Sequence, residues 1–408
     1  MRRRWILCVV VGAAASFASA QVQREMMTPA SSVEMPEDIG VRAHTNYFFY
    51  APQPGDSPTV PPPGGTVETP GSIACIYDLV SSPVSGCPVA TATTLPTGGS
   101  GTIVIVDAYD DPSAGADLKT FDANWGLTNT TFTKVYASGT KPANGCKSGW
   151  ELEEALDIQW AHAMAPKAKI VLMEAASNSD TDLYNAVLAA GSYIETHGGK
   201  GEVSMSWGGS EWSTEGLNDV DFLVFPNVVF LAAAGDSNGV SYPSASPWVI
   251  SAGATQINRN SSGDYTKQVG TKDCNKSNSG CGGGKSAYEA IPTYQSGVSG
   301  VVGSARGTPD IASDSSSGSP VWVYDSSCYG GWIAVYGTSV ASPTLAGIIN
   351  RAGTFAVDSA TELQEIYNNY TTKADYTDVT SGSCGSHSAK SGYDLCTGVG
   401  VVKGYGKK

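Results

Sequence analysis

Residues 149–173 read GWELEEALDIQWAHAMAPKAKIVLM and decide the fold class. Residues 149–164 have the length and the spacing of apolar residues that predict a helix. Residues 169–173 form a short, continuous apolar run, which is typical of a buried strand. A strand that is apolar on both sides belongs in the interior of a parallel sheet. The stretch therefore predicts one helix and one strand of an α/β fold.

The same alternation of strands and helices extends in both directions from this stretch. Strands are predicted at 102–106, 132–136, 203–207, 228–233 and 248–252, and helices at 117–125, 180–196, 339–351 and 360–367, with one more helix after residue 207. This pattern predicts an α/β domain with a mostly parallel central sheet and helices on both faces. The Gly- and Ser-rich residues 257–330 predict long loops or β-hairpins, and the tail from residue 375 is loop-like.

The first 20 residues read as a secretory signal. Three arginines at positions 2–4 precede the apolar run 5–15, and the small residues 18–20 form a cleavage site. The run is shorter than the about 18 residues that span a bilayer, so export and cleavage are favoured over a membrane anchor. The twin arginines also permit a Tat-type route. We therefore expect a secreted protein, either extracellular or periplasmic.

Charge and cysteine content agree with export. The formal charge is −14, and loss of the three leader arginines makes it −17, which argues against nucleic acid and anionic membranes as partners. A negative net charge is also typical of proteins that act at low pH, although a requirement for solubility would explain the charge as well. Of nine cysteines, one lies in the leader, and the remaining even number suits disulfides. The candidate pairs, with connectivity left open, are Cys75/Cys87, Cys274/Cys281, Cys384/Cys396 and the distant Cys146/Cys328.

A candidate nucleophile lies in residues 337–343, GTSVASP, which lead into an apolar helix. The positive end of the helix dipole stabilises nearby negative charge, and free backbone N–H groups there can bind an oxyanion. Ser339 could equally be a simple helix cap. The motif is shared with subtilisin-like proteases, which need a histidine base. None of His44, His162, His197 and His387 has the expected neighbours.

A pair of acids offers another base. Glu153 and Asp157 are spaced i, i+4 in the predicted helix, so both project from the same face. Two carboxyls held close together cannot both ionise easily, so they can share one proton and act as a base and then as an acid. The alternative is a solvated acidic face. The apolar neighbours Leu152 and Leu156 indicate that much of this helix is buried.

The acid pair, the serine motif and several further blocks resemble a family, the sedolisins or serine-carboxyl peptidases, which have a subtilisin-like fold. The resemblance covers about residues 100–402, and the matching blocks, in order, are 153–157, 160–166, 204–209, 232–237, 306–310, 337–339 and 392–398. It implies that Ser339 is the nucleophile, Glu153 its general base and Asp157 the second carboxylate. Asp236 would be the oxyanion-hole acid, because a neutral carboxyl can donate a hydrogen bond to the oxyanion. Without the resemblance, Asp236 would be read as a turn residue.

The resemblance also implies outer groups and a metal. Asp111 and Trp207 would belong to the carboxylate network. The C-terminal tail resembles the calcium-binding loop of the family, and one calcium ion would be held by the oxygen atoms of Asp378, Val379, Lys390, Gly392 and Asp394. Ordinary turn chemistry is the alternative for these Asp and Gly residues. The pair Cys384/Cys396 would brace this loop.

Domain boundaries follow from these assignments. We expect a signal peptide at 1–20, an N-terminal extension at 21–99 that is a short pro-segment or a linker, and a peptidase domain at 100–408. Sedolisins usually carry a much larger prodomain, so the resemblance leaves the activation route open.

The expected function is that of a secreted endopeptidase that forms an acyl-enzyme on Ser339 at acidic pH. Its partners would be protein and peptide substrates, with no nucleic acid and no membrane after signal removal, and we expect a monomer. The alternatives are a histidine-dependent subtilisin-type protease, a tripeptidyl-peptidase of the same family, and a catalytically dead binding protein on this scaffold.

Overall fold

The computed structural model describes residues 24–59, 66–128, 131–372 and 375–404. The signal peptide predicted over residues 1–20 lies outside them. Within these ranges, no helix combines the length and the apolar character that crossing a bilayer would require.

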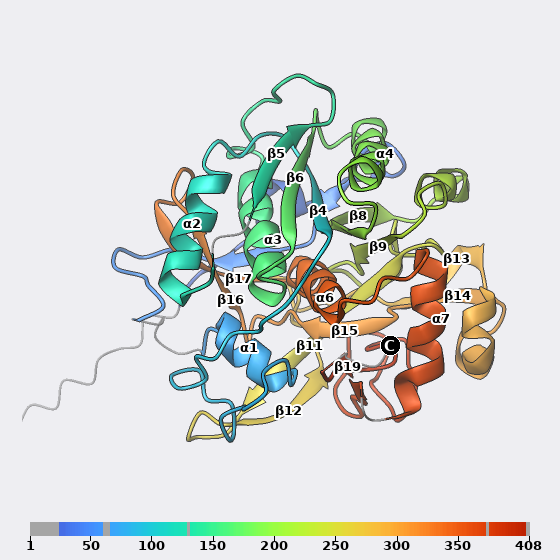
Figure 1. Ribbon diagram of the computed structural model, residues 1–408. Helices are drawn as coiled ribbons and strands as arrows, with labels where there is room; N and C mark the ends of the chain where they lie inside the picture. The colour runs from blue at the N-terminus through green and yellow to red at the C-terminus, as the bar shows by residue number, and fades with distance from the viewer. Residues whose placement is uncertain (1–23, 60–65, 129–130, 373–374, 405–408) are drawn as a thin grey trace, which may run out of the picture.

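A mostly parallel sheet forms the centre of the molecule (Figure 1). Its strands follow the order β18-β19-β15-β11-β9-β7-β4-β6-β5, and β12 pairs with β11. All pairs from β5 to β19 are parallel, and only the pairings of β18 and β12 are antiparallel. The predicted α/β class is therefore confirmed. The strands are β4 (Thr102–Ala108), β5 (Phe132–Tyr136), β6 (Lys169–Ala175), β7 (Gly201–Met205), β9 (Val228–Ala233), β11 (Ile250–Arg259), β12 (Tyr265–Gly270), β15 (Ile311–Asp314), β18 (Tyr376–Thr377) and β19 (Val401–Val402).

Helices cover both faces of this sheet because its strands are apolar on both sides. In β4, Ile103 and Ile105 pack in the cluster that contains α3 and α6, whereas Val104 and Val106 pack in the cluster that contains α4. The α-helices are α1 (Pro70–Ile76), α2 (Ala114–Trp125), α3 (Trp150–Met164), α4 (Asp180–Thr196), α5 (Ser299–Val302), α6 (Thr338–Ala352) and α7 (Ser359–Asn369). The 3-10 helices are η1 (Ala30–Ser32), η2 (Pro36–Asp38), η3 (Glu215–Phe222), η4 (Thr293–Val298) and η5 (Tyr370–Thr372). The helix predicted after residue 207 is thus a 3-10 helix, η3.

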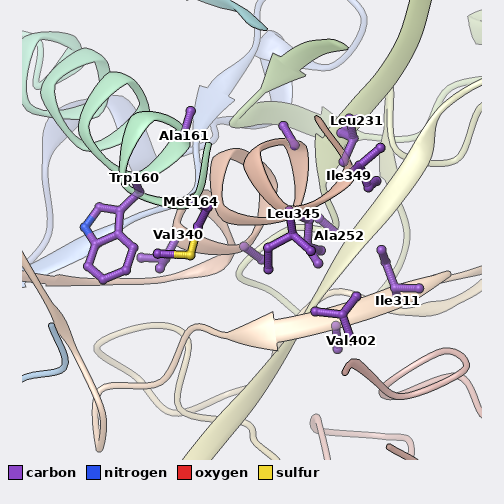
Figure 2. Close-up of a cluster of buried hydrophobic side chains, with 14 of the residues drawn as sticks. Trp160, Ala161, Met164, Leu231, Ala252, Ile311, Val340, Leu345, Ile349 and Val402 are labelled. Carbon is purple, nitrogen blue, oxygen red and sulfur yellow. The ribbon is translucent and has the colours of Figure 1, made fainter. Parts of the chain in front are cut away.

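The core between α3, α6 and the sheet fixes the two helices that carry the site. Figure 2 shows Met164 of α3 next to Leu345 of α6, with Trp160 of α3 on one side of them and Ala252 and Ile311 of the strands on the other. Full burial of a large apolar side chain contributes about 1.5–3 kcal/mol to folding. This cluster therefore holds α3 and α6 firmly in one relative position.

Three smaller sheets complete the fold, and two of them include strands that precede residue 100. The first has the order β1-β3-β17-β16, the second β10-β8-β2, and the third pairs β13 with β14. The strands before residue 100 have two or three residues and are too short to show a periodic pattern, so none was predicted there. The hairpin of β16 and β17 and the antiparallel pair β13–β14 agree with the hairpins expected within residues 257–330. The strands are β1 (Met26–Met27), β2 (His44–Thr45), β3 (Phe48–Tyr50), β8 (Trp207–Ser210), β10 (Ser241–Tyr242), β13 (Gly284–Ala290), β14 (Ala305–Thr308), β16 (Val321–Asp325) and β17 (Gly331–Tyr336).

Three of the four candidate cysteine pairs are disulfides: Cys75–Cys87, Cys146–Cys328 and Cys274–Cys281. The expected fourth bridge is not formed, because Cys384 and Cys396 are buried free thiols. The Sγ atom of Cys384 faces the carbonyl oxygen of His387 at 3.8 Å. A hydrogen bond with Cys384 and burial raise the pKa of the Cys396 thiol.

Candidate active site

The candidate nucleophile lies in the first turn of α6, as predicted. The preceding Gly337 has a φ of +121°, a backbone conformation that favours glycine. Pro343 has no N–H to donate to the carbonyl of Ser339 four residues earlier, and Ser206 Oγ donates to that carbonyl instead at 3.3 Å. Strand, turn and helix thus place the Ser339 side chain at the positive end of the helix dipole.

The predicted acid pair lies beside this serine. Ser339 Oγ donates a hydrogen bond to Glu153 Oε2 at 2.8 Å and also lies 3.1 Å from the carbonyl oxygen of Ser206. Glu153 belongs to α3, a helix in which every residue is buried, and Asp157 follows one turn later. The acidic face is therefore not solvated, and the structure brings Ser339, Glu153 and Asp157 together.

Burial of these acids without a nearby cation favours their protonated forms. The pKa of Glu153 is raised well above its ordinary value by burial, and further by Asp157 and Asp107. Burial also raises the pKa of Asp157. The neighbouring side chains of Ser206 and Glu153 lower this pKa, but by less than burial raises it. Among the described residues, neither carboxyl oxygen of Asp157 has a partner with hydrogen-bond geometry. Such a group stays neutral or shares a proton with its neighbour.

Asp107 is a third buried acid beside Glu153 and Asp157, and it was not predicted from the sequence. It lies in β4, is fully buried, and has its pKa raised by burial and by Asp157 and Glu174. A carboxyl at the end of the apolar run 102–106 was the available signal, since a buried strand rarely carries an acid without a purpose.

Asp236 lies three residues after the end of β9 and contacts Thr338, the residue before Ser339. Its Oδ1 atom accepts hydrogen bonds from the backbone N–H and from Oγ1 of Thr338, both at 2.8 Å. Its Oδ2 atom is buried and has no hydrogen-bond partner among the described residues. Burial raises the pKa of Asp236 well above its ordinary value. A Cβ at Gly337 would collide with Oδ2, so this glycine keeps the space beside the carboxyl open.

The two residues predicted as outer members of the carboxylate network do not touch Ser339 directly, and their role in the network stays a prediction. The Oδ1 atom of Asp111 accepts a hydrogen bond from the N–H of Ser113 at 2.7 Å, and its own N–H donates to Glu174 at 3.2 Å. Asp111 lies beyond the end of β4, where burial raises its pKa to about 7. Its contact with Glu174 links it to Asp107, whose pKa Glu174 also raises. Trp207 is buried, and its Nε1 donates to the carbonyl oxygen of Val106 at 2.8 Å. Neither residue has a hydrogen bond to Ser339 or Glu153 among the contacts of the described chain.

No histidine of the described chain hydrogen-bonds Ser339. His162 Nδ1 lies 2.7 Å from Asp122 Oδ1, and His44 Nε2 lies 3.2 Å from Asp38 Oδ2. The other two are His197, which stacks on Tyr193 at the end of α4, and His387, which lies in the C-terminal loop. The base beside the candidate nucleophile is therefore a carboxyl group.

The residues predicted to bind calcium lie in one C-terminal loop. The N–H of Gly392 donates to Asp378 Oδ2 at 2.9 Å, and the N–H of Lys390 donates to Asp394 Oδ2 at 2.6 Å. Two carboxylates and neighbouring backbone carbonyls would give an all-oxygen donor set, which is the chemistry that calcium prefers. The donor set therefore fits the ion, and calcium binding stays a prediction.

Comparisons with known proteins agree with this geometry. Residues 137–391 match the profile of the peptidase S8 family, described as the subtilase family. The chain belongs to the subtilase family. This subtilase is similar to kumamolisin of Bacillus sp. (strain MN-32), with 30% identity over 266 residues, which cover 60% of the chain and 46% of kumamolisin. It is also similar to sedolisin of Pseudomonas sp. (strain 101), with 38% identity over 117 residues, covering 28% of the chain and 19% of that relative.

A solved structure supports the fold assignment. Pseudomonas sedolisin, described as a serine-carboxyl proteinase and complexed with two molecules of pseudo-iodotyrostatin, superposes with a TM-score of 0.66 and 23% identity. The match covers 83% of this chain and 96% of that chain. The subtilisin-like fold and the resemblance to sedolisins are confirmed. This subtilase spans about half or less of the length of these curated relatives.

Proposed function

We propose that this subtilase is a secreted serine-carboxyl endopeptidase that hydrolyses peptide bonds in proteins at acidic pH. The observation that carries the proposal is the 2.8 Å hydrogen bond from Ser339 Oγ to Glu153 Oε2. A serine nucleophile needs a base within hydrogen-bond reach, and this carboxyl is in that position.

The groups around Ser339 suit acyl transfer. Glu153 takes the proton of Ser339 Oγ as this oxygen attacks the substrate carbonyl. Asp157, one helical turn further along α3, can share this proton with Glu153. The backbone N–H of Ser339 and a protonated Asp236 donate to the oxyanion. Glu153 then returns the proton to the leaving amine, and water releases the acyl-enzyme.

The proposed acidic working range follows from Asp236. Only its protonated form can donate a hydrogen bond to an oxyanion, so activity falls as pH rises through its folded-state pKa. That pKa lies well above the ordinary value because the group is buried. At the acid end, activity falls when the Glu153–Asp157 pair takes up its second proton.

Secretion and calcium belong to the same proposal. Three disulfides suit an oxidising compartment. Asp378 and Asp394, with the neighbouring carbonyl groups, would hold one calcium ion, which would supply charge compensation for the two carboxylates and brace the C-terminal loop.

The test compares two acids on the same helix. Glu153→Gln removes the proposed base and is expected to lower kcat/KM on a denatured protein substrate by about 10³-fold or more at every pH, as loss of Ser339 would. Glu154→Gln is the matched control, because Glu154 is equally buried on α3 but neither of its carboxyl oxygens has a hydrogen-bond partner among the described residues, Ser339 included. We expect this control to keep its activity. A histidine-dependent protease would instead keep its activity in Glu153→Gln.

A further inference from the structure

The proposed oxyanion acid, Asp236, lies outside the helices and strands of the described chain. β9 ends at Ala233, and Asp236 follows in a bend. Thr338 holds one carboxyl oxygen of Asp236, while the other oxygen has no partner among the described residues. A group that donates to an oxyanion has to be held within about 0.5 Å of its working position. The main chain of Asp236 therefore needs a support of its own.

A neighbouring loop, residues 274–282, supplies this support. The side-chain amide of Asn275 donates a hydrogen bond to the carbonyl oxygen of Asp236. The N–H of Gly282 donates to the carbonyl oxygen of Gly235 at 2.7 Å. Two successive carbonyl groups, those of Gly235 and Asp236, are thus bound from the same loop.

The loop also packs directly on the backbone around Asp236. A Cβ at Gly282 would lie 1.8 Å from the carbonyl oxygen of Ala234, so this close approach requires glycine. Two residues after Asp236, the side chain of Asn238 donates to the carbonyl oxygen of Ser279 at 2.8 Å. The loop therefore fixes the chain on both sides of the acid.

The side chain of Asn275 is itself held in one orientation. It is buried, and its Oδ1 atom accepts a hydrogen bond from Oγ of Ser277 at 2.8 Å. The disulfide Cys274–Cys281 closes the loop around it. An asparagine that only stabilised a turn would bond within its own loop. The bond to Asp236, 39 positions away, goes beyond that local role.

We propose that the loop 274–282 positions the oxyanion acid, and that Asn275 is the positioning residue through which it acts. The inference rests on the proposed function and adds a residue that acts through Asp236. With its carbonyl on Asn275 and Oδ1 on Thr338, Asp236 is held at its main chain and at its carboxyl group. Its free Oδ2 atom is then available to the oxyanion. Loss of the Asn275 amide leaves the acid present but misplaced.

Asn275→Ala tests this assignment by steady-state hydrolysis of a peptide at acidic pH, with activity expressed per folded molecule. We expect kcat to fall about 10-fold with little change in KM, because a misplaced oxyanion donor weakens binding of the transition state only. Lys276→Ala is the matched control, since Lys276 is the next residue of the same loop and is exposed, and it should keep its kcat. An unchanged kcat in Asn275→Ala would overturn this inference and leave the proposed function standing.

The same substitution in an Asp236→Ala background separates positioning from a general effect on the fold. A residue that acts only through Asp236 has no further effect once that carboxyl group is gone, so the two kcat values should agree within about twofold. A further fall of about 10-fold in the double variant would overturn the inference. If Asp236→Ala by itself leaves kcat unchanged, the oxyanion role in the proposed function fails, and this inference fails with it.

Asn275→Asp serves as a second variant if Asn275→Ala does not fold. It has nearly the same size and keeps the oxygen atom that Ser277 bonds. An ionised carboxyl group accepts hydrogen bonds only, so the introduced group cannot donate to the Asp236 carbonyl once it has lost its proton. We expect kcat to fall below that of the unmodified chain as pH rises through the pKa of this group. A pH profile parallel to that of the unmodified chain would contradict the inference.

Discussion

Two groups of buried acids in this domain differ in whether a buried cation compensates their charge. Asp310 forms a fully buried ion pair with Arg306, whose NH1 lies 2.8 Å from Oδ1, and it also accepts from the backbone N–H of Ser251 and from the hydroxyl of Tyr367, both at 2.8 Å. The acids around Ser339 have no such cation, and several of their oxygen atoms have no hydrogen-bond partner in the described chain.

The difference separates acids that hold the fold from acids that do chemistry. Asp310 is paired with Arg306 and fully hydrogen-bonded, so a change there should cost stability. Glu153, Asp157 and Asp236 are neutral or share protons, and this leaves them free to accept and donate protons during a reaction. Residues 306–310 and residues 153–157 both belong to the sequence blocks that resemble the sedolisins. Only the residues packed around them in the structure distinguish their acids.

The largest expected effect on stability tests the paired group. Asp310→Asn leaves the Arg306 guanidinium buried without a counter-charge and should lower the free energy of unfolding by about 3–5 kcal/mol. Chemical denaturation measures this, and Glu153→Gln is the matched comparison, with no loss of similar size expected. Equal losses in both variants would remove the distinction between the two groups. Activity per folded molecule of Asp310→Asn should be unchanged.

The next effect is on catalysis. Asp236→Ala should lower kcat by about 10²–10³-fold, because one oxyanion donor is lost. Asp236→Asn should retain much more activity and extend it to higher pH, since an amide donates a hydrogen bond whether or not the solution is acidic. The pH profile of kcat for both variants checks this. An alkaline limit that does not move in Asp236→Asn would show that another group sets it.

Stability should also fall as pH rises, because burial raises the pKa of several acids in the folded state. Burial raises the pKa of Asp111 and Glu174 to about 7 and that of Glu151 to about 8, from ordinary values of 3.8, 4.5 and 4.5 respectively. Between the ordinary and the raised values the folded state holds more protons than the unfolded chain, so the free energy of unfolding decreases with rising pH. We expect Tm to decline from about pH 4 to about pH 8.

A variant tests the source of that decline. Glu151→Gln cannot ionise, so its Tm should fall less steeply over the upper part of this range than that of the unmodified chain. A Tm that rises from acidic to neutral pH would contradict the prediction.

The smallest effect concerns the proposed calcium ion. A ligand that binds only the folded state at 100 times its Kd stabilises it by about 2.7 kcal/mol. A chelator should therefore lower Tm, and added calcium should restore it. Asp378→Asn should abolish this response, while the control Asp375→Asn, just before β18, should keep it. A chelator that leaves Tm unchanged in the unmodified chain would count against calcium.

Local pattern was sufficient for several features of this protein. The strands and helices between residues 102 and 252, together with α6 and α7, follow largely from apolar periodicity, and α4 and β9 match their predicted bounds. The central-sheet strands β15, β18 and β19 were not predicted, because they lie in stretches that lack this periodicity. The pairing of Glu153 with Asp157 follows from helix geometry alone. These features depend on residues within a few positions of one another, so they are readable from the chain.

Only the tertiary structure decided which distant groups meet. It placed Asp107 rather than Asp111 beside the acid pair, kept Cys384 and Cys396 as thiols, and laid Asn46 across Ser339. Each of these outcomes depends on how packed layers bring residues together that are far apart along the chain, and a short strand such as β2 leaves no periodic trace of its partner. Charge compensation is likewise a property of the surroundings, which is why identical acids differ in role.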